Sequence, residues 1–199
     1  MAESVKSLAS AHDLDLVAMA ATGGRVAFGE LVRRHSSPVR ALLRRLGADP
    51  ATADDVAQDA FLAAFEQISD FRGEGTFQAW VKRIAARLYV KRWRRQTRRD
   101  VLADAAEDDP PSTLPGEAGQ ADRIDLDEAL KSLSEAERLC VSLCYGAGLS
   151  HAEAAAALNT PLGTVKSHVK RGLDKLRQRL APGREFGASE GRGEGKVNG

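Results

Sequence analysis

Residues 150–180 read SHAEAAAALNTPLGTVKSHVKRGLDKLRQRL, and this stretch decides the kind of fold that we expect. Its pattern predicts a short helix that ends at residue 158, a tight break at Asn159, and a longer helix that begins with a proline. Ser150 with Glu153 is a capping-box signal, and proline is favoured in the first turn of a helix. A short helix, a brief turn and a longer helix form a helix-turn-helix, whose second helix enters the major groove of duplex DNA.

The longer helix has one apolar face and one polar, basic face. Apolar side chains recur at helical spacing along one side, at Leu162, Val165, Val169, Leu173, Leu176 and Leu180. On the other side, Arg171 can donate two hydrogen bonds to a guanine edge, and lysines can bind phosphates. The residues that we predict to contact DNA are Thr164, Lys166, Ser167, His168, Lys170 and Arg171. An amphipathic helix with a solvated basic face is the alternative, but it leaves the preceding short helix and turn unexplained.

Length and composition permit two small domains with an aliphatic core. The chain has 199 residues, of which 43% are hydrophobic and only 5% aromatic, so we expect a core of Ala, Leu and Val. The net charge is only +1, so the segregation of charge along the chain is more informative than its sum. No stretch is long enough to span a membrane and the N-terminus lacks a signal-peptide core, which predicts a cytoplasmic protein.

The two cysteines leave two interpretations open. Cys140 and Cys144 lie four residues apart in an apolar helical stretch, which is the wrong spacing for a CxxC site. No cluster of His or Cys completes a metal site, so we expect no metal and no cofactor. Two small buried side chains are the first interpretation, and a redox or metal switch is the second.

Helical periodicity dominates the rest of the chain, so we predict an all-α fold. The helices expected in the first half cover residues 13–21, 25–46, 52–69 and 76–99. We expect Thr52 to cap the third of these helices, with Asp55 three residues later completing a capping-box-like start. Pro38 is expected to bend or break the second helix, because proline cannot donate a helical hydrogen bond.

An acidic, proline-bearing stretch divides the chain into two small helical domains. Residues 103–122 carry few large apolar side chains, so they cannot bury enough surface to become ordered, and we expect a flexible linker. The predicted division is an N-terminal arm (1–12), a first domain (13–102), the linker (103–123), a helix-turn-helix domain (124–181) and a disordered tail (182–199).

The fourth helix combines an apolar stripe with a strongly basic character. All charged residues from Lys82 to Arg99 are basic. Tyr89 and Trp93 lie off the apolar stripe, so we expect them to be exposed. Exposed aromatic rings beside cations suit the binding of unstacked bases. A charged surface helix without a partner is the alternative, although it explains neither the uniform sign of the charge nor the exposed tryptophan.

The third helix has a different outer face. Ala57, Phe61 and Ile68 are expected to face the core, whereas the outer face is acidic with a single leucine. The outer residues are Asp54, Asp55, Gln58, Asp59 and Leu62. This face is either a protein-binding surface or an ordinary solvated acidic face.

Three stretches together resemble a known family. They are DDVAQDAF at residues 54–61, TFQAW at residues 76–80 followed by Ile84 and Ala85, and GTVKSHVKR at residues 163–171. In this order, with an acidic linker before the third stretch, they resemble the small two-domain bacterial sigma factors of the extracytoplasmic-function group. The resemblance covers residues 13–99 and 124–180, and it implies a region 2-like bundle joined to a region 4-like helix-turn-helix domain.

The resemblance implies a role for each surface. Asp55, Gln58, Asp59 and Leu62 would dock on core RNA polymerase, and the helix-turn-helix would read the minus-35 duplex. The residues that it places at the minus-10 element are Phe71, Arg72, Lys82, Arg83, Arg87, Tyr89, Lys91 and Trp93. It also implies promoter DNA and an anti-sigma factor as partners, a monomer when free, and no enzymatic activity.

The sequence departs from the family pattern at four positions. Arg87 stands where the family often has Asn, Val90 where it often has Asp, His168 where it often has Arg, and Gly172 where it often has Ala. A mid-helix glycine costs up to about 1 kcal/mol relative to alanine. The differences at Arg87 and Val90 concern the base that is preferred at the minus-10 element. The differences at His168 and Gly172 concern the sequence that is preferred at the minus-35 element.

Two other function classes are compatible with parts of the sequence. A free-standing repressor or activator would use only the helix-turn-helix and would bind duplex DNA tightly without polymerase, as a dimer. A nuclease or recombinase would need a carboxylate cluster for metal or an activated nucleophile. The repressor or activator hypothesis leaves the basic, aromatic helix without a function. The nuclease or recombinase hypothesis needs an inward-facing acidic site, and the sequence shows no convincing one.

Overall fold

The computed structural model describes residues 8–103 and 121–180, and all regular elements within these ranges are helical. The predicted all-α fold is therefore confirmed for this part of the chain. The first half contains α2 (Asp13–Ala21), α3 (Arg25–Leu46), α4 (Pro50–Glu66), the short η1 (Ile68–Asp70) and α5 (Phe77–Ala103). The second half contains α6 (Ala121–Lys131), α7 (Glu135–Val141), the π-helical turn η2 (Ser142–Gly146), α8 (His151–Leu158) and α9 (Leu162–Leu180). Most of the predicted linker and the predicted tail lie outside the described residues.

Local capping explains the helix-turn-helix. Ser150 and Glu153 form a complete capping box at the start of α8. Asn159 closes α8 in the left-handed conformation, with φ of 54°, which asparagine tolerates better than most residues. The Pro161 carbonyl then accepts hydrogen bonds from Thr164 and Val165, so α9 starts directly after the proline. The predicted helix-turn-helix is thereby confirmed as a local structure.

The start of α4 differs from the prediction. Its N-cap is Asp49, whose carboxylate accepts the Thr52 backbone N–H at 3.0 Å, and Pro50 occupies the first turn. The prediction that Thr52 is the N-cap is therefore wrong by three residues. An aspartate followed by a proline is itself a strong helix start, because the proline needs no hydrogen-bond acceptor there. The helix also ends earlier than predicted, at Glu66.

Pro38 does not interrupt α3, which is assigned as one helix from Arg25 to Leu46. The prediction of a break is wrong. Leu31, Val39 and Leu43, on both sides of the proline, are fully buried along one face of this helix. Burial of this face outweighs the loss of one helical hydrogen bond, which is the main local cost of an internal proline.

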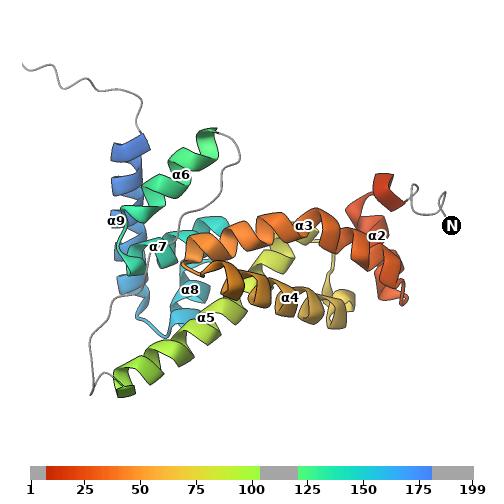
Figure 1. Cartoon of the computed structure of the whole chain (residues 1–199), viewed down its shortest axis with the longest axis horizontal. Helices are drawn as coiled ribbons and strands as arrows, with labels where there is room; N and C mark the ends of the chain where they lie inside the picture. Colours follow the sequence, from red (N-terminus) through yellow and green to blue (C-terminus); the bar gives the residue numbers. More distant parts are fainter. Residues whose placement is uncertain (1–7, 104–120, 181–199) are drawn as a thin grey trace, which may run out of the picture.

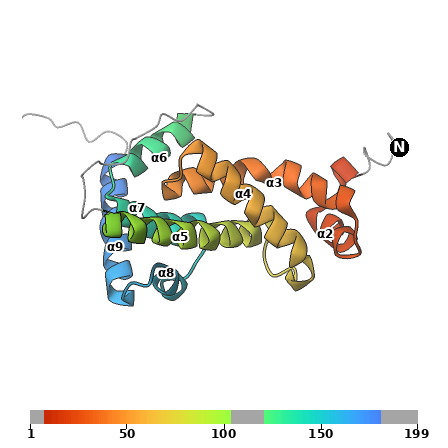
Figure 2. The same ribbon diagram turned by 60° about the horizontal axis from the view of Figure 1, so that its bottom comes forward.

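The two halves pack against each other. Figure 1 and Figure 2 show α2 at one end of the described structure and α9 at the other, with α5 running past α8. Helix α5 contacts α8, and α3 contacts α7 and η2. One core cluster joins Leu42 and Val90 of the first half to Leu143 and Ala154 of the second. A smaller cluster around Leu176 fills the space among α6, α7 and α9. The described structure is thus a closed arrangement of two helical units.

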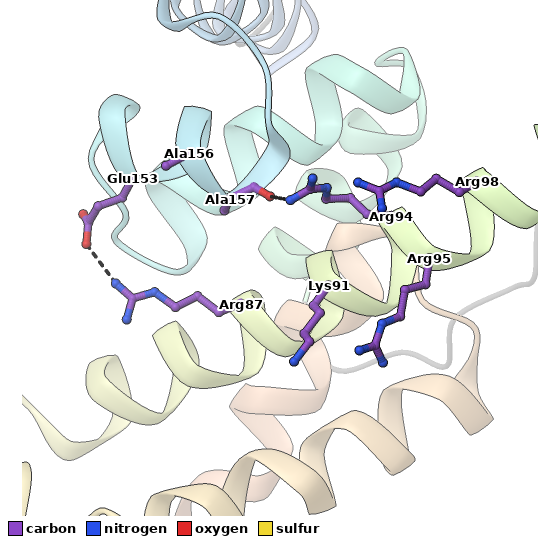
Figure 3. A pocket seen from close by; sticks show the side chains of 8 residues that line it. All are labelled: Arg87, Lys91, Arg94, Arg95, Arg98, Glu153, Ala156 and Ala157. Carbon is purple, nitrogen blue, oxygen red and sulfur yellow. Dashed lines mark hydrogen bonds and ion pairs between the residues drawn. The ribbon is translucent and has the colours of Figure 1, made fainter.

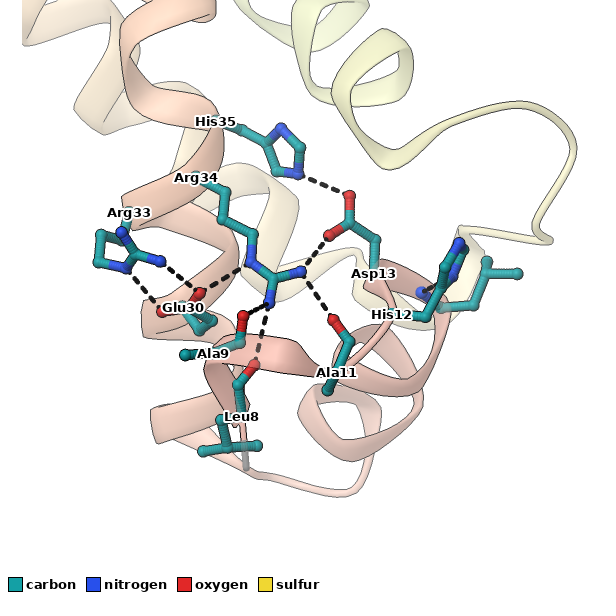
Figure 4. A network of polar contacts seen from close by, with 10 residues as sticks. Leu8, Ala9, Ala11, His12, Asp13, Glu30, Arg33, Arg34 and His35 are labelled. Atoms are coloured by element: carbon teal, nitrogen blue, oxygen red, sulfur yellow. Dashed lines mark hydrogen bonds and ion pairs between the residues drawn. The ribbon is translucent and has the colours of Figure 1, made fainter. Parts of the chain in front are cut away.

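A polar network fixes the N-terminal end. In Figure 4 the Arg34 guanidinium lies among the backbone carbonyls of residues 8–11 and the Asp13 carboxylate. Arg34 Nη1 donates to Asp13 Oδ1 at 2.8 Å, and His35 Nε2 lies 2.7 Å from Asp13 Oδ2. Burial raises the pKa of Asp13, but the hydrogen bonds from Arg34 and His35 outweigh burial and lower it below its ordinary value. These contacts attach residues 8–11 to α3.

Candidate nucleic-acid and polymerase interfaces

The predicted reading face of α9 is open to solvent. Val165, Val169 and Leu176 are buried beneath it, whereas Leu162 and Leu180 at the two ends are about two-fifths exposed. His168 is half-buried, and the other five predicted contacts, Thr164, Lys166, Ser167, Lys170 and Arg171, are exposed. The Ser167 hydroxyl donates to the Gly163 carbonyl at 2.9 Å, one turn earlier in the helix. The polar face therefore has the accessibility that groove reading requires.

The basic face of α5 lies against the second half of the molecule. Figure 3 shows five α5 cations beside α8, around a cavity of about 440 Å³. The cations are Arg87, Lys91, Arg94, Arg95 and Arg98, and the α8 residues are Glu153, Ala156 and Ala157. This concentration of positive charge suits a polyanion such as a nucleic acid strand.

Three arginines of α5 already have partners across the interface. Arg83 donates to the Gly148 carbonyl at 2.7 Å, and Arg94 donates to the Ala157 carbonyl at 3.2 Å. Arg87 pairs with Glu153 at 3.1 Å. Nearby, burial lowers the pKa of the half-buried Lys82 ammonium, and the charge of Arg45 lowers it further. Part of the predicted minus-10 surface is therefore occupied by the second half in the closed arrangement.

Tyr89 and Trp93 of α5 do not have the exposure that we predicted. Tyr89 is only 7% exposed, and burial raises its pKa to about 12, with Glu135 adding to the shift. Trp93 is half-buried against the core, and its indole N–H donates to Glu135 at 3.0 Å. The prediction of two exposed rings is wrong, because the α5 face beyond the first-domain stripe packs against the second half. Val90 on the same helix is 1% exposed and so also belongs to the core.

The loop before α5 rests on an aromatic cluster. The half-buried Phe71 ring lies 5.4 Å from the Trp80 ring and 6.0 Å from the Phe77 ring. Arg72 is exposed, and Gly73 and Gly75 adopt positive φ angles of 75° and 89°, which glycine accepts without strain. The structure therefore presents Arg72 on a loop whose base is fixed by packed rings.

The outer face of α4 is exposed and borders an apolar groove. Asp55, Gln58 and Asp59 are exposed, and Leu62 is 56% exposed. Beside them is a groove of about 490 Å³, whose apolar lining comes from α3 and α4: Phe28, Val32, Ala57, Phe61, Leu62 and Phe65. The α3 contribution was not part of the sequence prediction, which placed the docking residues on α4 alone. The polar lining of the groove carries both signs of charge, from Asp54, Arg25 and Arg40, and its apolar floor suits an amphipathic partner.

The cysteines are enclosed by protein. Cys140 is buried and Cys144 is half-buried. Burial raises the pKa of Cys140 to about 11, with Cys144 adding to the shift, and burial also raises the pKa of Cys144. Protonated thiols are poor nucleophiles and metal ligands, which favours the interpretation as small packed side chains.

Within residues 8–103 and 121–180, the structure contains no helix with the length and apolar character needed to cross a membrane.

Comparison with known proteins agrees with the two-part structure. The family models for Sigma-70 region 2 and Sigma-70, region 4 match residues 31–99 and 129–178 respectively. The ECF RNA polymerase sigma-E factor of Escherichia coli (strain K12) is 32% identical over 182 residues, which cover 85% of this chain and 95% of that protein. ECF RNA polymerase sigma factor SigE of Mycolicibacterium smegmatis is 35% identical, with coverage of 81% of this chain and 65% of that relative.

A solved structure shows the same fold. It is the sigma factor RpoE from Bartonella quintana, in complex with the anti-sigma factor NepR. It is 25% identical, with a TM-score of 0.54, and the match covers 79% of this chain and 98% of that chain. The chain therefore belongs to the sigma-70 family of RNA polymerase sigma factors, in its extracytoplasmic-function (ECF) group.

Proposed function

We propose that this sigma factor binds core RNA polymerase through the outer face of α4 and directs it to promoters through two DNA-binding surfaces. The polymerase surface consists of Asp55, Gln58, Asp59 and Leu62 together with the adjoining groove. The minus-35 surface is the polar face of α9, and the minus-10 surface comprises the loop at Phe71 and Arg72 with the basic face of α5. The proposal requires no chemistry catalysed by the chain itself, only binding.

One observation carries the proposal: the α4 face and the reading face of α9 are both exposed and belong to different halves of the molecule. One chain can therefore hold polymerase and duplex DNA at the same time. A free-standing repressor would need only α9 and would leave the exposed Leu62 and its apolar groove without a function.

The closed arrangement adds a step to this function. Arg83, Arg87 and Arg94 hold the second half against the helix that is proposed to bind the separated strands. The burial of Tyr89 belongs to the closed arrangement, so Tyr89 joins the proposed strand surface only once the halves separate. The two halves must separate before α5 can receive a DNA strand, and binding to polymerase, which would engage each half at its own surface, favours that separation. The domain boundaries predicted from the sequence are retained as part of the proposal.

Control by an anti-sigma factor is also part of the proposal. The similar RpoE from Bartonella quintana was solved with the anti-sigma factor NepR. An inhibitor that covers the α4 groove or stabilises the closed arrangement would prevent both polymerase docking and strand binding.

Run-off transcription tests the function directly. Purified core polymerase is mixed with a library of genomic promoter fragments, with and without this protein, and the transcripts are sequenced. We expect specific start sites only when the protein is present. Absence of binding to core polymerase would refute the sigma-factor function, whereas tight sequence-specific duplex binding without polymerase would favour a free-standing regulator.

A paired variant tests the docking surface. Gln58→Ala with Asp59→Ala should weaken polymerase binding without unfolding the protein, because both side chains are exposed. Glu66→Gln, an exposed change at the end of the same helix, is the matched control. Equal polymerase affinity for the double variant and the control would remove the docking assignment.

A further inference from the structure

A buried carboxylate lies directly behind the reading face of α9. Glu137 of α7 is only 4% exposed. Lys175 Nζ donates to its Oε2 at 2.7 Å, and Arg171 Nε lies 3.8 Å from its Oε1. The hydrogen bond from Lys175 lowers the pKa of Glu137 despite its burial, so the carboxylate is ionised at neutral pH. Two cations of the proposed DNA-binding helix therefore share one fixed anion.

A glycine makes this arrangement possible. A Cβ atom at Gly172 would lie 2.7 Å from Val141 Cγ2 and 3.5 Å from Glu137 Cβ. A side chain at position 172 would force Val141 or α9 to shift, so the glycine allows the close approach that brings Glu137 under the turn that carries Arg171. The glycine is unfavourable for helix propensity but accommodates this packing.

Arg171 has a second restraint on the exposed side. Its Nη2 lies 3.1 Å from His168 Nδ1, so the guanidinium is positioned between an imidazole of its own helix and the carboxylate of α7. Arginine has many rotamers, and fixing them before binding reduces the entropy that is lost when DNA is bound. A restrained guanidinium also has fewer phosphates within reach, which favours a base edge over the backbone.

We propose that Glu137 is a positioning residue for minus-35 recognition, which holds Arg171 in the orientation that reads a guanine edge and withholds Lys175 from non-specific phosphate contacts. This inference rests on the proposed function of α9. Glu137 also completes the capping box of α7 by accepting the Ser134 backbone N–H at 3.1 Å, which is the only role that its sequence position indicates.

Glu137→Gln tests the proposal, because glutamine can maintain the capping box while removing the charge. Full-length protein with core polymerase is presented with duplexes randomised over the minus-35 region, and the bound fraction is sequenced. The position whose preference disappears in Arg171→Ala defines the base pair that Arg171 reads. At that position, we expect Glu137→Gln to lower the preference for the favoured base pair over the others about threefold to tenfold. Non-specific affinity should rise, with a salt slope steeper by about one phosphate contact.

The matched control is Asp174→Asn, which removes one negative charge from α9 itself. Asp174 pairs with Arg177 at 2.8 Å, outside the predicted reading face. We expect it to leave the preference at the Arg171 position unchanged. A double variant distinguishes positioning of Arg171 from a purely structural role of Glu137. In the Arg171→Ala background, Glu137→Gln should have no further effect on base preference, because the side chain that Glu137 positions is absent.

The outcomes separate this inference from the proposed function. If the unmodified holoenzyme shows no minus-35 preference, the proposed function fails. If it shows a preference that Glu137→Gln leaves intact, only the positioning role fails. Should Glu137→Gln not fold, Gly172→Ala tests the same contact, provided that the variant is destabilised and Val141 has therefore not simply moved aside. The destabilised variant should show a lower preference at the same position, and an unchanged preference would overturn the positioning role.

Discussion

The Trp93 indole N–H donates a 3.0 Å hydrogen bond to the Glu135 carboxylate, and this contact joins the proposed strand-binding helix to the start of α7. The two residues come from different halves of the protein, with the predicted linker between them in the sequence. A ring that would be available to stack on an unpaired base is thereby held by the neighbouring half. The contact makes the arrangement of the two halves, and not only the composition of α5, a determinant of strand binding.

A larger side chain at the interface between the halves should separate them. A Cβ atom at Gly146 would lie 2.8 Å from Cδ1 of the buried Leu42. We expect Gly146→Leu to open the closed arrangement, raising the radius of gyration in small-angle scattering and increasing the affinity of the free protein for single-stranded DNA. Gly29→Leu is the control, because a Cβ there has no atom within 4 Å. Identical scattering from the two variants would show that Gly146 does not hold the halves together.

Truncation of Leu62 should weaken polymerase binding more than it changes stability. Leu62 is 56% exposed at the edge of the apolar groove, so Leu62→Ala should change the free energy of unfolding by no more than about 0.5 kcal/mol. A central apolar anchor of an interface typically contributes about 1 kcal/mol or more, so we expect at least a fivefold loss of affinity for core polymerase in a titration. Leu14→Ala, at a leucine 49% exposed on α2, controls for surface truncation. A loss of affinity as large for Leu14→Ala as for Leu62→Ala would contradict the prediction.

Gly172→Ala should destabilise the protein although alanine is the better helix former. The gain in helix propensity is about 1 kcal/mol, whereas overpacking a tight contact costs about 1 to 3 kcal/mol. With Val141 Cγ2 only 2.7 Å from the new Cβ, we expect a net loss of about 1 kcal/mol in urea unfolding. The same change at Gly29, where the space is open, should be stabilising. Stabilisation at both positions would show that Val141 moves aside freely.

The Asp13 network should make stability depend on pH in the acid range. The folded-state pKa of Asp13 lies below its ordinary value, so its contribution to stability is complete above about pH 4 and is lost as the pH falls through the lower, folded-state pKa. We expect Asp13→Asn to lower the urea midpoint at pH 7. Below pH 4, the urea midpoints of Asp13→Asn and the unmodified protein should lie closer together. Asp15→Asn, at an exposed acid on the same helix, should leave the urea midpoint unchanged both at pH 7 and below pH 4. A constant difference between Asp13→Asn and the unmodified protein at all pH values would exclude the carboxylate charge as the cause.

Features that depend on neighbouring residues were predictable from the sequence. The capping box at Ser150 forms as expected, because it involves a backbone N–H and a side chain three residues apart. The acidic face of α4 is exposed because helical periodicity alone places it opposite the buried Phe61. The N-cap of α4 was missed even though Asp49-Pro50 is itself a local signal.

Features that depend on contacts between distant residues came only from the tertiary structure. Burial of Tyr89, pairing of Trp93 with Glu135 and continuity of α3 through Pro38 all arise from surfaces that meet only when the helices pack. The same reason applies to Glu137, whose sequence position indicates a capping residue and whose place behind Arg171 depends on the close approach of α9 to α7. The sequence by itself thus determined the helices, their polar faces and the family, because these follow from residue spacing and motifs. Only the packing decided which parts of those faces the other half covers, as at Tyr89 and Trp93, since that burial depends on what the rest of the chain brings alongside.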